Sequence, residues 1–139
     1  MKIVLDARHL SQRLHGIARY TENLIRYLPL ESNDCYIVLY HPNHFTPWEH
    51  PQIEWYPCPI SFFSLQEQIS LPRLLKKLSP DLFHAPSYVV PYHIPCPYLM
   101  TLHDLIHVHF AKDYSKFHQI YYQYWTRRLA CKAKMILTV

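Results

Sequence analysis

The chain has 139 residues, 50% of them hydrophobic and 15% aromatic, and a formal net charge of +4 at pH 7. This length fits one domain with a substantial core, and a composition this apolar excludes an intrinsically disordered chain. The modest positive charge suits anionic small molecules or light contact with an acidic membrane surface, and it does not demand nucleic acid.

Predicted strands and helices alternate through the first half of the chain. Residues 2–6 form an apolar run bounded by charge, which indicates a buried strand. Apolar residues at helical spacing follow from Gly16 onward and predict a helix. Residues 35–40 and 53–56 are rich in β-branched and aromatic side chains, which predicts the second and third strands.

The same alternation continues through the second half. Residues 65–78 carry leucine and isoleucine on one face and basic side chains on the other, as in an amphipathic helix. Residues 81–84 and 97–102 predict short strands, 114–134 predicts a long tyrosine-rich helix, and 135–139 predicts a sixth strand. This alternation favours an α/β fold with a Rossmann-like, doubly wound, mostly parallel sheet.

The only glycine of the chain, Gly16, lies between the first predicted strand and the first predicted helix. A glycine there lets the backbone approach a ligand closely, and a helix N-terminus offers free N–H groups to a phosphate. The alternative is a helix cap or tight turn without a ligand, because one glycine is far weaker than a complete G-x-G-x-x-G fingerprint.

Polar and aromatic residues follow two of the predicted strands, where ligands of parallel α/β sheets bind. His84, Ser87 and Tyr88 follow the strand over 81–84, and their hydroxyl and aromatic groups suit a sugar. His103 and Asp104 follow the strand over 97–102, and a histidine there can donate a hydrogen bond near neutral pH. The alternatives are turn packing for the first group and a helix N-cap for Asp104.

Arg8 and His9 lie just beyond the first predicted strand, in a position to face the same cleft. We interpret His41, His44, His50 and His118 as surface or packing residues. No secretory signal or membrane-spanning apolar run is visible, and the four cysteines form no C-x-x-C pair. We therefore expect a cytoplasmic protein with reduced thiols.

A third hypothesis comes from His103 and His107, which have the spacing of the H-E-x-x-H zinc motif with Asp104 in place of the glutamate. This pattern would indicate a metal-dependent hydrolase. The motif requires both histidines on one face of a helix, whereas His103 directly follows a predicted strand. We therefore expect no metal site.

Several ordered segments resemble the N-terminal domain of the family 4 (group 1) retaining glycosyltransferases, which have the GT-B architecture. The matching segments are Lys2-Ile3-Val4-Leu5-Asp6-Ala7-Arg8, Gly16-Ile17-Ala18-Arg19-Tyr20-Thr21-Glu22-Asn23-Leu24, Asp81-Leu82-Phe83-His84-Ala85-Pro86, Thr101-Leu102-His103-Asp104-Leu105, and Arg127-Arg128 leading to Ala133-Lys134-Met135-Ile136-Leu137-Thr138-Val139. The chain departs from many relatives at Ala18, where they carry a second glycine.

The resemblance implies transfer of a mannose- or glucose-like sugar from a nucleotide-sugar to a glycan or lipid-linked acceptor, with retention and without an obligatory metal or other cofactor. Gly16 would border the donor diphosphate, and His103 would contact the transferred sugar as the catalytic residue. The acceptor side would include Asp104, Arg19 and the loop with His84, Ser87 and Tyr88.

The resemblance also implies that residues 1–139 are a single acceptor-side domain. The donor-binding C-terminal domain, with its E-x-x-x-x-x-x-x-E motif, has no counterpart in the chain. We expect the chain to be inactive alone and to act in surface polysaccharide or lipopolysaccharide synthesis, in the cytoplasm with peripheral contact at the inner face of the membrane. The alternative function is a non-catalytic binding or scaffold domain, or a truncated remnant.

Overall fold

The computed structural model describes residues 1–11, 16–103 and 121–139. Its centre is a six-stranded sheet in the order β3-β2-β1-β4-β5-β6, with every neighbouring pair of strands parallel. The strands are β1 (Lys2–Asp6), β2 (Cys35–Tyr40), β3 (Ile53–Pro57), β4 (Leu82–Ala85), β5 (Tyr98–Leu102) and β6 (Met135–Thr138). The predicted α/β fold with a doubly wound parallel sheet is confirmed.

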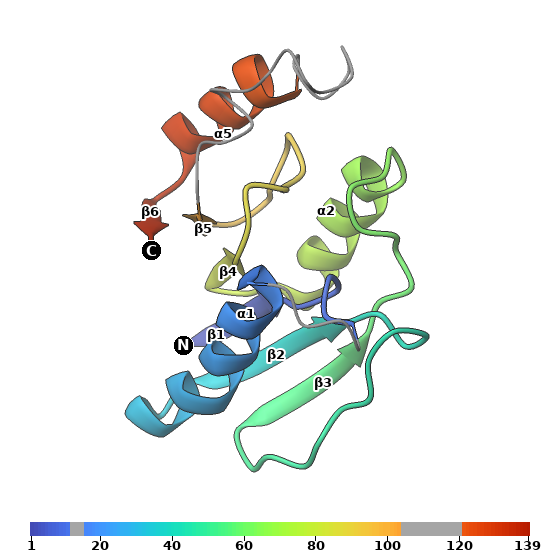
Figure 1. The fold of residues 1–139 in the computed structure, drawn as a ribbon, viewed down its shortest axis with the longest axis vertical. Helices are drawn as coiled ribbons and strands as arrows, with labels where there is room; N and C mark the ends of the chain where they lie inside the picture. The colour runs from blue at the N-terminus through green and yellow to red at the C-terminus, as the bar shows by residue number, and fades with distance from the viewer. Residues whose placement is uncertain (12–15, 104–120) are drawn as a thin grey trace.

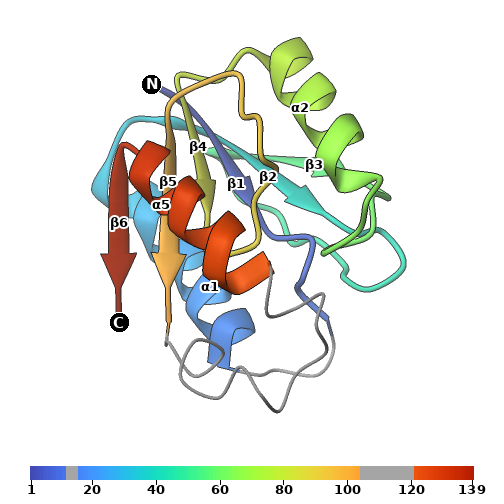
Figure 2. The same ribbon diagram turned by 90° about the horizontal axis from the view of Figure 1, so that it is seen from above.

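Helices cover both faces of this sheet. α1 (Gly16–Tyr27) lies on one face, and α2 (Glu67–Leu78) and α5 (Arg127–Lys132) lie on the other (Figures 1 and 2). A 3-10 turn, η1 (Leu28–Glu31), follows α1, and a π-helical segment, η3 (Tyr121–Thr126), precedes α5. Residues 104–120 of the predicted strand-to-helix connection and long helix lie outside the described residues.

Alternate residues of β1 build two separate cores. Val4 is fully buried against the side that α2 covers, in a cluster with Leu71 and Leu75. Its neighbour Leu5 packs on the opposite side, in a cluster with Ala18 and Ile25 of α1. The continuous apolar run of β1 is therefore explained, because successive side chains of a strand point to opposite faces and both faces are covered.

The connection between β2 and β3 is a loop without a helix, and its aromatic side chains pack against the sheet. Trp48 and Trp55 lie with ring centroids 4.8 Å apart, and the Trp55 indole N–H donates to the Trp48 carbonyl at 2.7 Å. Phe45 packs against both rings. The Arg26 guanidinium of α1 lies 4.7 Å from the Trp48 ring centroid, so this loop covers the sheet beside α1.

The strand order reverses between β1 and β4, because the chain proceeds from β1 outward to β2 and β3 and then returns through α2 to β4. The carboxyl ends of these two strands mark the switch point at which open α/β sheets bind ligands. Among the described residues, no helix is long and apolar enough to cross a membrane. All four cysteines are free thiols.

Candidate functional site at the switch point

A cavity of about 380 Å³ opens beside the switch point. Its walls come from the segments that follow β1, β2, β3 and β4, together with the first turn of α1. The described residues that line it are Arg8, His9, Ile17, His41, His44, Ser61, Phe62, Ser87, Tyr88 and Val89. A cavity of this size, with aromatic walls and several hydrogen-bonding groups, suits a small polar ligand.

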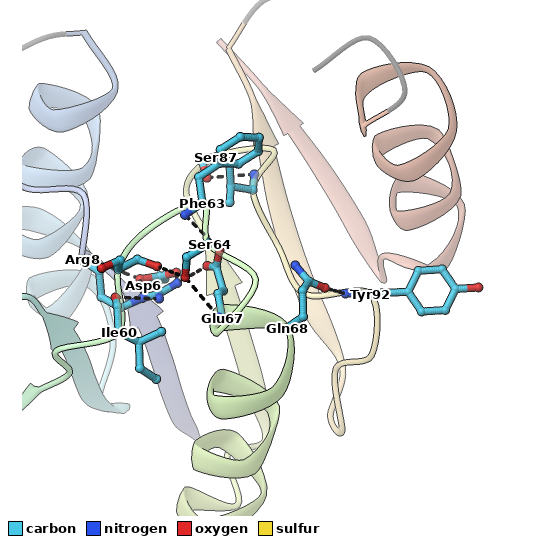
Figure 3. Close-up of polar contacts among 11 residues, drawn as sticks. Asp6, Arg8, Ile60, Phe63, Ser64, Glu67, Gln68, Ser87 and Tyr92 are labelled. Atoms are coloured by element: carbon cyan, nitrogen blue, oxygen red, sulfur yellow. Dashed lines mark hydrogen bonds and ion pairs between the residues drawn. The ribbon is translucent and has the colours of Figure 1, made fainter. Parts of the chain in front are cut away.

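The inner wall of the cavity rests on a buried ion cluster of Asp6, Arg8 and Glu67 (Figure 3). The Arg8 guanidinium donates to Asp6 through Nε at 2.8 Å and through Nη2 at 2.7 Å. Its Nη2 also donates to Glu67 Oε1, and its Nη1 donates to the Ile60 carbonyl at 3.2 Å. All three charged side chains are at most 1% exposed, so one cation is held between two carboxylates out of contact with water.

The two carboxyl groups of this cluster respond differently to burial. Burial opposes ionisation of Asp6, but the charge and hydrogen bonds of Arg8 outweigh it and hold the pKa of Asp6 below its usual value. Burial raises the pKa of Glu67, with Arg8 opposing this rise and the Asp6 charge adding to it. Glu67 is therefore the member of the cluster that accepts a proton more readily than an ordinary glutamate.

Glu67 also fixes the loop that forms one wall of the cavity. Its Oε2 accepts a hydrogen bond from the Phe63 backbone N–H at 3.0 Å, and its own N–H donates to Ser64 Oγ at 3.2 Å (Figure 3). Phe63 has a φ of 58°, a left-handed conformation that is costly for a bulky residue. The carboxylate thus holds a strained turn directly beside Ser61 and Phe62, which line the cavity.

Two of the sequence-predicted acceptor residues, Ser87 and Tyr88, line the cavity. Ser87 is 2% exposed, and its Oγ accepts a hydrogen bond from the Val89 N–H at 3.1 Å (Figure 3). That contact leaves the hydroxyl proton of Ser87 to donate elsewhere. Arg8 and His9, which the sequence placed near the same cleft, also line the cavity.

His103 lies at the end of β5 and is tied to the loop that carries Ser87. Its Nε2 lies 3.0 Å from the Pro86 carbonyl oxygen, which can only accept, so Nε2 carries a proton. Its ring meets Tyr20 of α1 edge to face, with centroids 4.9 Å apart. His103 is half-buried and is absent from the described lining of the cavity.

The structure does not bring His84 to the cavity. This residue is 3% exposed within β4, and its Nε2 lies 3.3 Å from Thr101 Oγ1 on β5. Thr101 Oγ1 in turn lies 3.4 Å from the Tyr20 hydroxyl. Burial lowers the pKa of His84 to about 4, so the imidazole is neutral at physiological pH.

The remaining predicted site residues are distributed differently. Gly16 is the exposed first residue of α1, and a Cβ added there would meet no atom of the described residues within 4 Å. Arg19 is exposed on α1 outside the described cavity lining, and Asp104 lies outside the described residues.

Sequence reasoning does not place His41 and His44 in the site and interprets them as surface or packing residues. Both line the cavity, and their rings stack with centroids 4.2 Å apart and planes inclined by 16°. His41 directly follows the last residue of β2, so the rule that ligands bind at carboxyl ends of parallel strands would have found it.

No group of three or more His, Cys, Asp or Glu side chains suited to hold a metal occurs within 1–11, 16–103 and 121–139. His107, the second histidine of the proposed zinc motif, lies outside the described residues. The structure therefore contributes no support for the metal-dependent hydrolase, and the expectation that no metal is needed stays a prediction.

A parallel sheet with a polar, aromatic cavity at its switch point defines the class of Rossmann-like ligand-binding domains. Within this class the chain belongs to glycosyltransferase family 4, because the model of that family matches residues 14–139. No curated protein and no solved structure matches the chain significantly. The family and the fold together support a glycosyltransferase.

Proposed function

We propose that this domain is the acceptor-binding half of a retaining GT-B glycosyltransferase. In this proposal the complete enzyme transfers a mannose- or glucose-like sugar from a nucleotide-sugar to a glycan or lipid-linked acceptor during surface polysaccharide or lipopolysaccharide synthesis. The observation that carries it is the cavity at the switch point of a family 4 domain. The donor-binding residues would come from a second domain.

The chemistry of the cavity supports a sugar acceptor. The Phe62 and Tyr88 rings line it together with the Ser61 and Ser87 hydroxyl groups. Aromatic rings pack against the C–H face of a sugar. Hydroxyl and imidazole groups can donate hydrogen bonds to sugar hydroxyls and accept hydrogen bonds from them. The buried ion cluster of Asp6, Arg8 and Glu67 keeps this wall in one geometry before the acceptor binds, which reduces the entropy lost on binding.

In the same proposal His103 is the catalytic residue that contacts the transferred sugar. Its position at the carboxyl end of β5, held by Pro86 and Tyr20, supports this role. A positioned imidazole stabilises charge that develops on the sugar and on the departing diphosphate. Asp104, Arg19 and His84 remain predicted acceptor-side residues, and for His84 the support is limited to its place beside Thr101.

Gly16 offers a test of the donor site. Gly16→Ala should change the free energy of unfolding by no more than about 1 kcal/mol, because the added methyl meets no atom within 4 Å in the part of the chain that the structure describes. If the donor diphosphate approaches this backbone closely, the same methyl should weaken nucleotide-sugar binding about tenfold, or ~1.4 kcal/mol. Denaturant unfolding and NMR titration measure the two effects. Unchanged binding would assign Gly16 to a simple helix start.

The isolated chain provides the first test of the proposed division of labour. We expect weak nucleotide-sugar binding, with NMR shift changes at the Gly16 amide, and no transfer to any acceptor. Detectable turnover by these 139 residues would contradict the proposal that a second domain is required. A non-catalytic binding domain, the second candidate, would bind glycans in the cavity and show no response to the nucleotide-sugar.

Peripheral membrane contact is also proposed, and a mixed aromatic and basic surface supports it. The centroid of the exposed Tyr92 ring lies 5.5 Å from the Arg128 guanidinium carbon and 4.3 Å from Lys132 Nζ. Tyr124 is 72% exposed on the neighbouring η3 segment. Aromatic rings beside cations suit the interface of an anionic membrane.

A further inference from the structure

The polar groups that line the cavity are unbalanced in charge. Its described lining contains four basic residues, Arg8, His9, His41 and His44, and no aspartate or glutamate. The two carboxylates of the ion cluster, Asp6 and Glu67, bind Arg8 and are absent from the lining. The Arg8 side chain is itself 0% exposed, so an anionic ligand in the cavity would contact the imidazole rings rather than the groups of the ion cluster.

The stacked pair of His41 and His44 forms the part of this lining that can gain charge. The Asn43 backbone N–H donates to His41 Nδ1 at 3.4 Å, so in the neutral ring the proton lies on Nε2. His44 is exposed, whereas His41 is 8% exposed. Protonation of His41 turns this donor–acceptor pair into a cationic site at the cavity wall.

The surroundings of His41 oppose this protonation. Burial, followed by the neighbouring His44 and Arg8 groups, lowers the pKa of His41. The groups that face His41 are thus His44 from its own loop and Arg8 from the segment after β1, with Asp6 and Glu67 behind Arg8. A bound anion would offset the repulsion from Arg8 and His44, so binding and proton uptake favour one another.

Resting on the proposed function, we propose that the sugar acceptor carries a compact anionic group, a phosphoryl or a carboxylate, which binds at the His41–His44 pair beside Arg8. The aromatic and hydroxyl walls hold the sugar ring of the same acceptor. The acceptor class is thus an acidic sugar, and its affinity falls as pH rises.

The dependence on pH follows from linkage. An imidazole that is neutral in the free protein and charged in the complex takes up a proton on binding, and this uptake is favourable at low pH. For each proton taken up, affinity falls by at most about tenfold per pH unit. Glucuronate keeps a charge of −1 between pH 6 and 8, so any change in its affinity reports the protein.

NMR titration of the full chain with glucose, glucuronate, glucose 6-phosphate and inorganic phosphate tests the proposal. At pH 6 we expect at least one of the two acidic sugars to bind about tenfold more tightly than glucose, with shift changes at His41, His44 and Ser87. The advantage of glucuronate should shrink severalfold by pH 8. The comparison of glucuronate with glucose 6-phosphate distinguishes the carboxylate from the phosphoryl source.

The outcomes separate this inference from the proposed function. Equal binding of glucose and both acidic sugars in the cavity would overturn the anionic acceptor and leave a neutral sugar acceptor standing. Failure of every sugar to perturb the cavity would overturn both proposals. Inorganic phosphate that binds as tightly as glucose 6-phosphate would show an anion site without a sugar site and would also overturn the inference.

His44→Gln is the decisive variant because His44 is exposed and its replacement should leave the fold intact. We expect this variant to lose about tenfold more affinity for the acidic sugars than for glucose. His93→Gln, an exposed histidine outside the described cavity lining, is the matched control and should behave as the wild type. Equal losses for glucose and the acidic sugars in His44→Gln would contradict an anion-binding role.

Discussion

Arg8→Met should lower the free energy of unfolding by about 3–5 kcal/mol, because it leaves two buried carboxylates without a cation. Arg8 supplies four of the hydrogen bonds that hold Asp6, Glu67 and the Ile60 carbonyl. Methionine preserves much of the buried volume, so the expected loss comes from charge and hydrogen bonding rather than from a cavity. Denaturant unfolding at pH 7 measures it.

Two further variants check this explanation. Arg26→Met breaks an ion pair with Glu22 whose side chains are 49% and 25% exposed, and it should cost about 1 kcal/mol or less. Combining Arg8→Met with Asp6→Asn and Glu67→Gln removes the unpaired charges and should restore part of the lost stability. Equal losses in Arg8→Met and Arg26→Met would show that the buried cluster does not have the role we assign to it.

His84 should make folding stability sensitive to acid. Burial holds its pKa at about 4 in the folded chain, against an ordinary value of 6.5. Between these values the unfolded chain binds the proton and the folded chain does not, so stability is lost as pH falls from 6.5 to 4. The shift corresponds to about 3 kcal/mol, at 1.36 kcal/mol per pKa unit.

His84→Gln isolates this contribution, because glutamine places a polar group near Thr101 without titrating. The stability of the variant should fall by about 3 kcal/mol less than that of the wild type between pH 7 and pH 4. Urea unfolding at a series of pH values gives both curves. His93→Gln serves as an exposed control, and parallel curves for the wild type and His84→Gln would contradict a neutral buried imidazole.

The order of strands and helices was predictable because this fold gives each element a strong local pattern. β1 and β2 have both faces covered, so they read as continuous apolar runs with the bounds that the sequence predicted. α2 begins at Glu67, two residues later than predicted. The preceding residues form a turn instead, because the Glu67 carboxylate accepts a hydrogen bond from the Phe63 N–H and the Glu67 N–H donates to the Ser64 hydroxyl. Such tertiary contacts leave no periodic signal.

The site was less predictable, because its residues come from separate loops. Ser87 and Tyr88 were identified from their position after a strand, and they line the cavity. Glu67 was missed because a glutamate in the first turn of an amphipathic helix ordinarily faces solvent. Only the fold shows that it binds Arg8, which lies 59 residues away in the sequence. His84 was assigned to the site because the sequence does not reveal which face of β4 it occupies.

The buried cluster connects the fold to the proposed activity. Asp6 is the last residue of β1, Arg8 lies in the segment that follows, and Glu67 is the first residue of α2. The Arg8 guanidinium therefore joins the end of β1 to the start of α2. The same Arg8 lines the cavity, and the same Glu67 holds the turn beside Phe62. The wall on which the acceptor would rest is therefore built from the contacts that stabilise the domain.

Fusion of this chain to the donor-binding half of a family 4 glycosyltransferase, followed by an assay of sugar transfer, tests the central claim most directly. We predict that the folded fusion transfers a sugar to a glycan acceptor with retained anomeric configuration, as shown by NMR of the product. His103→Ala in the fusion should abolish transfer while leaving the fold intact. A folded fusion that binds nucleotide-sugar and transfers nothing to any glycan would contradict the acceptor-binding role.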